Sequence, residues 1–123
     1  ALHWLVTGKT LGGTALYSKE NLLDRTEALR LYTLGSAALT GEGNVKGAIK
    51  AGQLADLAIL TADYLSVPED QIPQIESVLT LLGGKVVYGK GEYEKGAPPA
   101  LPVSPAWSPA AVYNGWGGAK KKQ

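Results

Sequence analysis

The 123-residue sequence contains no cysteine and a single histidine, His3. The lack of cysteine excludes disulfide bonds and thiolate chemistry, but it leaves the redox compartment open. A metal site made by this chain alone would need at least two carboxylates that converge on His3. No carboxylates are spaced to do so, and we therefore predict no catalytic residue, no metal ligand and no cofactor-binding residue in the chain.

Methionine is also absent, and the sequence opens with the apolar stretch ALHWLV. A natural N-terminus normally supplies a methionine unless processing removes it, and a secretory leader has a basic, then an apolar, then a small-residue region. Neither pattern is present. We therefore expect residue 1 to be an artificial or proteolytic beginning inside a longer chain. The compartment stays open, with the cytoplasm favoured, because the N-terminal targeting region is not visible.

Charge of one sign and long apolar runs are both scarce. Twelve Lys and Arg against eleven Asp and Glu leave a net charge of +1, far from the positive potential that holds nucleic acid or an anionic membrane. No run approaches the roughly 20 apolar residues that a transmembrane helix needs. We expect neither nucleic acid nor a membrane as a partner.

The main helical signals lie in the first 43 residues. Residues 2–7 are mostly large and apolar and end at Gly8, which is typical of the last turns of a buried helix. Asp24 and Glu27 form the acidic variant of a capping box, which predicts a second helix that begins at Arg25. Apolar side chains cover well over one face of this helix, which indicates burial against something large.

The second helix is expected to end at Gly41 and Gly43. After Asn44 the pattern becomes extended: residues 45–50 alternate loosely, residues 51–53 supply a turn, and residues 56–60 have strand length. Asp56 stands at the edge of that strand, and two interpretations of its carboxylate stay open: a structural role in which it accepts a turn amide, which we favour, or a catalytic role.

The strongest strand signal surrounds Gly83 and Gly84. Residues 75–82 and 85–88 flank this pair, and both glycines tolerate positive φ, which predicts a tight β-hairpin. Residues 64–75 contain two prolines and are expected to form a connection with one helical turn. Beyond Gly96 five prolines favour an extended path with three aromatic anchors, Trp107, Tyr113 and Trp116.

These elements make a poor core by themselves, because so small a sheet needs a second sheet or helices to cover it. The fragment therefore needs partners. No pair of carboxylates presents itself as a general acid and base. For His3 two interpretations stay open: a helix histidine satisfied by a carbonyl or lining a pocket, or a residue that contacts substrate.

The run from Lys46 to Leu60, KGAIKAGQLADLAIL, resembles the "KGSI-x-x-GK-x-ADL" signature near the C-terminus of the amidohydrolase superfamily. With residues 27–33 before it, residues 78–88 after it and the tail at 104–109, the chain looks like the type 3 amidohydrolases. The resemblance spans nearly the whole chain.

This resemblance implies an α/β parent enzyme: a TIM barrel with histidine and carboxylate ligands for zinc or another divalent metal, plus a small β-sandwich. Residues 1–43 would be the last helices of the barrel, residues 44–96 strands of the sandwich, and residues 97–123 an irregular proline-rich tail. In such a family the metal activates water for attack on a carbonyl, and a barrel-strand aspartate moves the proton. All of those residues lie N-terminal to the matched region.

The resemblance also puts His3, Trp4 and Lys9 near the barrel mouth, with His3 as a neighbour of the substrate pocket. We expect a structural C-terminal segment of a metal-dependent hydrolase of amide or imide C–N bonds, not catalytic by itself. Its partner would be the remainder of the enzyme, with a homo-oligomer left open. The alternative is a stand-alone β-rich module that binds a protein through its aromatic tail.

Overall fold

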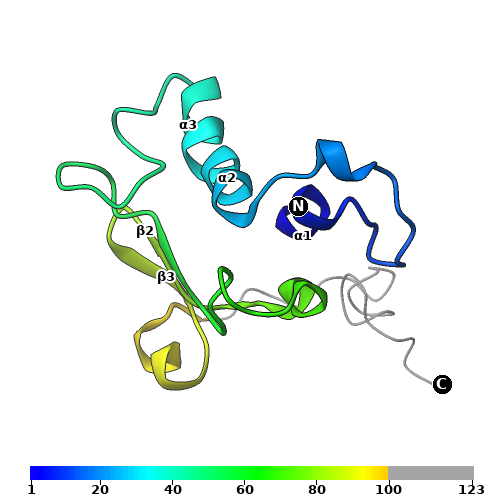
Figure 1. Ribbon diagram of the computed structural model, residues 1–123. Coiled ribbons are helices and arrows are strands. Elements are labelled where there is room, and N and C mark those ends of the chain that lie inside the picture. The colour runs from blue at the N-terminus through cyan, green and yellow to red at the C-terminus, as the bar shows by residue number, and fades with distance from the viewer. Residues whose placement is uncertain (100–123) are drawn as a thin grey trace, which may run out of the picture.

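The computed structural model describes residues 1–99, which form short helices and one small sheet (Figure 1). In chain order the elements are α1 (Leu2–Thr7), the 3₁₀ helix η1 (Lys19–Asn21), α2 (Arg25–Arg30), the π-helix η2 (Leu31–Gly35), α3 (Ser36–Leu39), β1 (Leu57–Leu60), the 3₁₀ helix η3 (Glu69–Gln74), β2 (Ser77–Leu82), β3 (Lys85–Gly89) and the 3₁₀ helix η4 (Gly91–Gly96). Within residues 1–99 no helix has the length and apolar character to cross a membrane.

Helix α1 ends where the sequence predicts. Gly8 adopts φ 66°, and its N–H donates to the carbonyl of Trp4 at 2.8 Å. A left-handed residue at this position closes the last turn, and glycine takes that conformation without a Cβ clash. The chain then folds back on itself, because Leu16 N donates to Gly8 O at 2.8 Å and Lys9 pairs with Ala15.

The second helix begins at Arg25, as the capping box predicts. Asp24 Oδ1 accepts from Glu27 N at 2.8 Å, so the N-cap side chain satisfies an amide that the helix leaves free. The helix runs through α2, η2 and α3 to Leu39, and Gly41 at φ 71° follows its end. The π-helical stretch in the middle was not predicted, because periodicity does not distinguish it from the α-helix.

In this chain the second helix is far less buried than its apolar pattern indicates. Only Ala28 and Ala37 of the helix are buried. Leu31 and Tyr32 are exposed, and the Leu39 side chain is 91% exposed. The apolar face that the sequence assigns to a large neighbour therefore has no such neighbour within residues 1–99.

The three strands form one antiparallel sheet in the order β1-β2-β3. The hairpin prediction is confirmed: Leu82 pairs with Lys85 across Gly83 and Gly84, whose φ values are 55° and 79°. These angles belong to the type I′ turn, whose twist matches that of the strands. Leu57 pairs with Leu81, which places β1 on the other side of β2.

The prediction of extended structure for residues 45–50 is wrong. These residues form turns, and the strand begins only at Leu57. The reason is local: Val45 N and Lys46 N both donate to Glu42 O, and Gly47 takes φ 100°, a conformation that a regular strand does not contain. Within residues 1–99 there is one sheet, so this part of the chain does not build a sandwich by itself.

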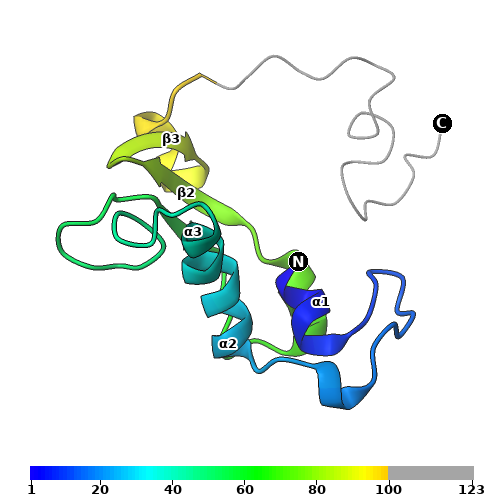
Figure 2. The ribbon, with the colours of Figure 1, turned by 90° about the horizontal axis from the view of Figure 1, so that it is seen from above.

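The small core lies between α1, α2 and the segment that contains η3, not within the sheet. Its buried apolar members are Val6, Ala28, Tyr64 and Ile72, whereas the buried Ala37 lies in α3 against Gly47. α1 packs against both α2 and η3, and both views of the ribbon show α1 beside α2 (Figures 1 and 2). η4 packs against β3 and β2. The expected helical turn at residues 64–75 is present as η3.

Candidate functional site

Residues 43–56, which we call the bridging segment, run from the end of the second helix to the start of β1. They contain most of the run that resembles the amidohydrolase signature. In Figure 1 the segment is the loop between the α3 end of the second helix and the sheet. The helical segments α2, η2 and α3 make no extensive direct contact with the strands. The bridging segment, by contrast, contacts both the second helix and the hairpin of the sheet.

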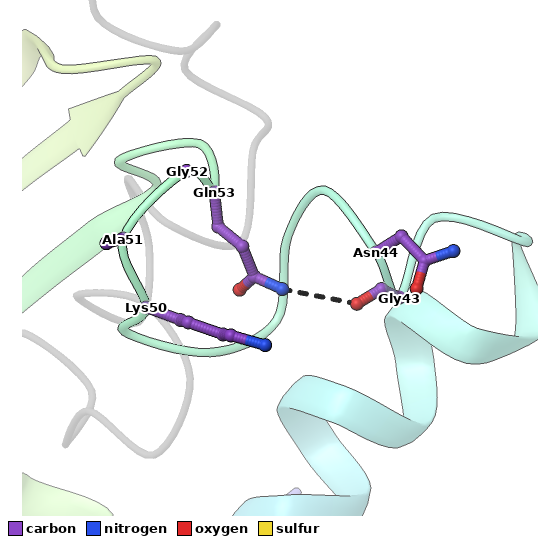
Figure 3. Close-up of a pocket in the computed structure, with 6 residues that line it drawn as sticks. All are labelled: Gly43, Asn44, Lys50, Ala51, Gly52 and Gln53. Atoms are coloured by element: carbon purple, nitrogen blue, oxygen red, sulfur yellow. Dashed lines mark hydrogen bonds between the residues drawn. The ribbon is translucent and has the colours of Figure 1, made fainter.

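Gln53 holds the bridging segment together with both ends of its side-chain amide. Its Nε2 donates to Gly43 O at 3.2 Å, a contact that Figure 3 shows, and its Oε1 accepts from Ala48 N at 3.2 Å. The two partners fix the orientation of the amide, because a carbonyl only accepts and an amide N–H only donates. Leu54 N adds a backbone bond to Val45 O at 2.7 Å.

Gly47 brings the bridging segment against the second helix. A Cβ added to Gly47 would lie 2.9 Å from the Cβ of Ala37 and 3.2 Å from both Leu34 Cα and Thr33 O. The φ of 100° is a second obstacle to any other residue. Glycine is therefore required at this position for the loop to reach the helix.

Asp56 attaches the other end of the bridging segment to the hairpin turn. Its Oδ1 accepts from Gly83 N at 2.7 Å, which confirms the prediction that this carboxylate accepts a turn amide. The neighbouring carbonyl of Ala55 accepts from Gly84 N at 3.0 Å. Both amides of the two-residue turn are thus bound by residues that lie 27 or more positions earlier. A carboxylate acceptor makes the first bond charge-assisted.

Two shallow hollows lie on the bridging segment. One has a volume of about 170 Å³ and contains the polar side chains of Asn44, Lys50 and Gln53 (Figure 3). The other, of about 160 Å³, is lined mainly by apolar residues between Ala48 and Leu57. Neither combines a nucleophile with a base, so neither offers the arrangement that acid–base or covalent catalysis needs.

His3 lies on α1 and is partly exposed. Its backbone carbonyl accepts from Thr7 Oγ1 at 2.7 Å, but its side chain forms no hydrogen bond within residues 1–99. It lines neither hollow, and the described part of the chain brings together no group of three His, Asp or Glu side chains that could hold a metal. The proposed place of His3 beside a substrate pocket stays a prediction.

Trp4 and Lys9, the other two residues that the resemblance puts near a barrel mouth, lie on α1 and on the loop after it. Trp4 packs against Tyr17, with ring centroids 5.1 Å apart and planes tilted by 40°. Both rings are partly exposed, and Lys9 is exposed. The tilted geometry is one that aromatic pairs favour. The described structure therefore holds Trp4 by an aromatic contact and leaves Lys9 in solvent.

The shifted pKa values belong to surface carboxylates that accept hydrogen bonds, to Lys90 in its ion pair with Glu76, and to the buried phenol of Tyr64. The hydrogen bond from Lys46 lowers the pKa of Glu42, and the Thr40 hydroxyl adds to this effect. Burial raises the pKa of Tyr64, whose Oη has no hydrogen-bond partner among the described residues. Such a phenol stays protonated at neutral pH.

Sequence reasoning missed the roles of Gly47 and Gln53. An isolated glycine inside a weak strand pattern is a known sign of close backbone approach, and Gly47 carries that sign. Gln53 carries none, because its two bonds depend on where Gly43 and Ala48 lie in space. The aromatic anchors Trp107, Tyr113 and Trp116 lie outside the described residues.

Comparison with known proteins extends these findings. A sequence profile described as "Amidohydrolase family" matches residues 1–88. The chain is 32% identical over 74 residues to the "Putative amidohydrolase YtcJ" of Bacillus subtilis (strain 168), which covers 60% of this chain and 14% of that protein. It is 30% identical over 83 residues to the N-substituted formamide deformylase of Arthrobacter pascens, which covers 68% of this chain and 15% of that protein.

No solved structure matches the chain significantly. The aligned parts make up 14% and 15% of the two relatives, so the chain spans about a seventh of the proteins it matches. The profile covers all helices and strands of the described structure up to Tyr88, including the whole bridging segment and its contacts with the helix and the hairpin turn. The chain belongs to the amidohydrolase family.

Proposed function

We propose that this chain is the C-terminal structural segment of a metal-dependent amidohydrolase that hydrolyses amide or imide C–N bonds. Residues 1–43 supply the last helices of a TIM barrel, and residues 44–96 supply strands of a small β-sandwich. The remainder of the enzyme holds the metal and the catalytic groups. The observation that carries this proposal is the large apolar surface that is exposed on residues 1–99.

That surface includes residues from both parts of the fold. Leu39 at the end of the second helix and Ile49 in the bridging segment are each 91% exposed. Ile59, Leu60 and Leu82 of the sheet are exposed too. Soluble monomers rarely expose large apolar surfaces unless these are interaction sites. The helix and the sheet therefore both need a covering layer, as barrel helices and a second sheet would provide.

The comparisons support the reaction class. One relative is named an N-substituted formamide deformylase, and removal of a formyl group from an N-substituted formamide breaks a C–N bond. The other is named an amidohydrolase. Because the chain aligns with about a seventh of each relative, the substrate and the reaction are assigned to the complete enzyme.

The residues of this chain do not fit the metal that the family implies. His3 is its only histidine, and among residues 1–99 no group of three potential ligands gathers around it or anywhere else. A zinc ion in a catalytic site takes three protein ligands and keeps an open position. The metal ligands are therefore assigned to the remainder of the enzyme, and no catalytic step is derived for this segment.

The proposal is tested by producing the chain alone and together with the remaining amidohydrolase sequence. We expect the chain alone to contain no stoichiometric zinc and to hydrolyse no N-substituted formamide or cyclic imide. The complete protein is expected to bind zinc and to hydrolyse one of these substrates. Bound zinc with turnover in the isolated chain would overturn the proposal. A monodisperse monomer that melts cooperatively would also contradict it and would favour the protein-binding module.

The same substitution in two contexts sharpens this test. Leu39→Lys is expected to leave the isolated chain unchanged or more soluble, since the side chain is already 91% exposed. In the complete enzyme it should lower the melting temperature, because burial of an unpaired ammonium is costly. Equal melting temperatures for the complete enzyme with and without Leu39→Lys would show that this face stays uncovered.

A further inference from the structure

We propose that the bridging segment is a mechanical coupler that makes the end of the second helix and the tip of the β2–β3 hairpin respond as one unit. This role goes beyond the proposed function, because it assigns the signature-like residues to the transmission of motion instead of to chemistry. It also gives a reason for the many contacts that this run of small and polar residues makes.

The first set of contacts fixes the bridging segment to the helix. Gly47 lies directly against Ala37, at a distance that leaves no room for a side chain. Gln53 Nε2 reaches Gly43 O, the first residue of the segment. Through its Oε1 the same side chain binds Ala48 N, one residue beyond Gly47. The Gln53 amide therefore closes the bridging segment on itself, and the packing of Gly47 on Ala37 ties this closed loop to the helix.

The second set fixes the segment to the hairpin. Asp56 Oδ1 and Ala55 O bind the two successive amides of the Gly83-Gly84 turn at 2.7 and 3.0 Å. Asp56 and Ala55 directly follow Leu54, whose own amide is bonded to Val45 O. Only two peptide units thus separate the bonds of Gln53 from the bonds to the turn. Hydrogen bonds at both ends remove conformational freedom from this short connection, so we expect a displacement at one end to reach the other.

Direct packing between the second helix and the strands does not replace the bridging segment as a link. The helical segments α2, η2 and α3 do not pack extensively against the strands. A second link lies at the opposite end of the helix, where Arg25 Nη1 donates at 2.8 Å to the carbonyl of Tyr64 in the segment between β1 and η3. The hairpin tip itself contacts the bridging segment, so its position depends on that segment.

Coupling and purely local stabilisation predict different results for amide hydrogen exchange, measured residue by residue in the full chain. Among the described residues, the side-chain hydrogen bonds of Gln53 do not reach the hairpin turn, and those of Asp56 do not reach the helix end. If the segment couples them, Gln53→Leu should speed the exchange of the Gly83 and Gly84 amides. Asp56→Ala should speed the exchange of the Gly41 and Glu42 amides, which bond to Ala38 O and Ala37 O. Free-energy coupling is reciprocal, so both effects are required.

We expect an acceleration of about tenfold at each remote end, the scale of one lost hydrogen bond. Asp56→Asn keeps an acceptor oxygen and should exchange like the unmodified chain at Gly41 and Glu42. Gln74→Leu is the matched control for Gln53→Leu. Gln74 is exposed, and its side chain makes no hydrogen bond among residues 1–99. It should change neither end.

Exchange that changes only at the substituted end would overturn the proposal, and so would an effect of Gln74→Leu equal to that of Gln53→Leu. If Gln53→Leu does not fold, Gln53→Glu replaces it. The glutamate keeps an acceptor for Ala48 N and loses the donor to Gly43 O. Faster exchange at Gly83 and Gly84 in this variant supports the coupler, and unchanged exchange refutes it. This readout is independent of turnover, so it separates failure of the coupler from failure of the proposed function.

Discussion

The Cβ of Ala37 lies 2.9 Å from the point that a Cβ on Gly47 would occupy, so helix and bridging segment meet where neither has room for a larger side chain. Gly52, in the same segment, has a similar positive φ of 87° but nothing within 4 Å of its Cβ position. A comparison of Gly47 with Gly52 therefore distinguishes the cost of a positive φ, which both positions share, from the cost of a steric clash, which arises at Gly47.

Gly47→Ala should destabilise the fold more than Gly52→Ala. A positive φ costs a residue with a Cβ about 1–2 kcal/mol, which both variants lose. The clash adds about 1–3 kcal/mol at Gly47 alone, the usual cost of overpacking. Chemical denaturation of the two variants beside the unmodified protein measures the difference. Equal losses would mean that the segment does not press on Ala37.

The hairpin turn gives a second prediction. Replacing both Gly83 and Gly84 by valine should lower the free energy of unfolding by about 1 kcal/mol or more at each position, because β-branched residues resist positive φ. Gly12, which does not have a positive φ, is the control, and Gly12→Val should cost much less. In the complete enzyme, activity per folded molecule should survive. Unchanged stability with abolished turnover would contradict a structural role for the hairpin.

The helix N-cap is a third test. Asp24→Ala should cost about 1 kcal/mol, since Glu27 N loses the acceptor that lies 2.8 Å away. Asp24→Ser supplies another N-cap oxygen and should restore most of the loss. Thermal unfolding followed by circular dichroism distinguishes the three proteins. A serine variant as unstable as the alanine variant would show that the cap bond is not the cause.

The pair formed by Glu42 and Lys46 predicts a pH dependence. Lys46 Nζ lies 2.7 Å from Glu42 Oε2 and lowers the pKa of that carboxyl. A carboxyl whose folded pKa is depressed stabilises the fold above its unfolded pKa, and this contribution is lost as the pH falls through the folded pKa. Lys46→Gln should raise the pKa of Glu42 toward its ordinary range, which carboxyl ¹³C NMR titration measures. Lys50→Gln, the control, should leave that pKa unchanged.

The sequence alone determined the features that depend on neighbouring residues. Asp24 and Glu27 predicted the helix start, Gly8 predicted the end of α1, and Gly83-Gly84 predicted the turn of the hairpin. Each of these signals acts within a few residues, through a cap bond or a permitted φ, so no distant contact is needed to interpret it. The order of short motifs also identified the family before any fold was considered.

Only the tertiary structure decided how the bridging segment is built. Residues 45–50 alternate like a strand, yet they form turns, because Gly47 must pass over Ala37 and Gln53 must reach Gly43 and Ala48. The bond from Gly83 to Asp56 spans 27 positions. Contacts that join distant residues leave no periodic trace in the sequence, since they depend on where the helix and the hairpin come to lie in space.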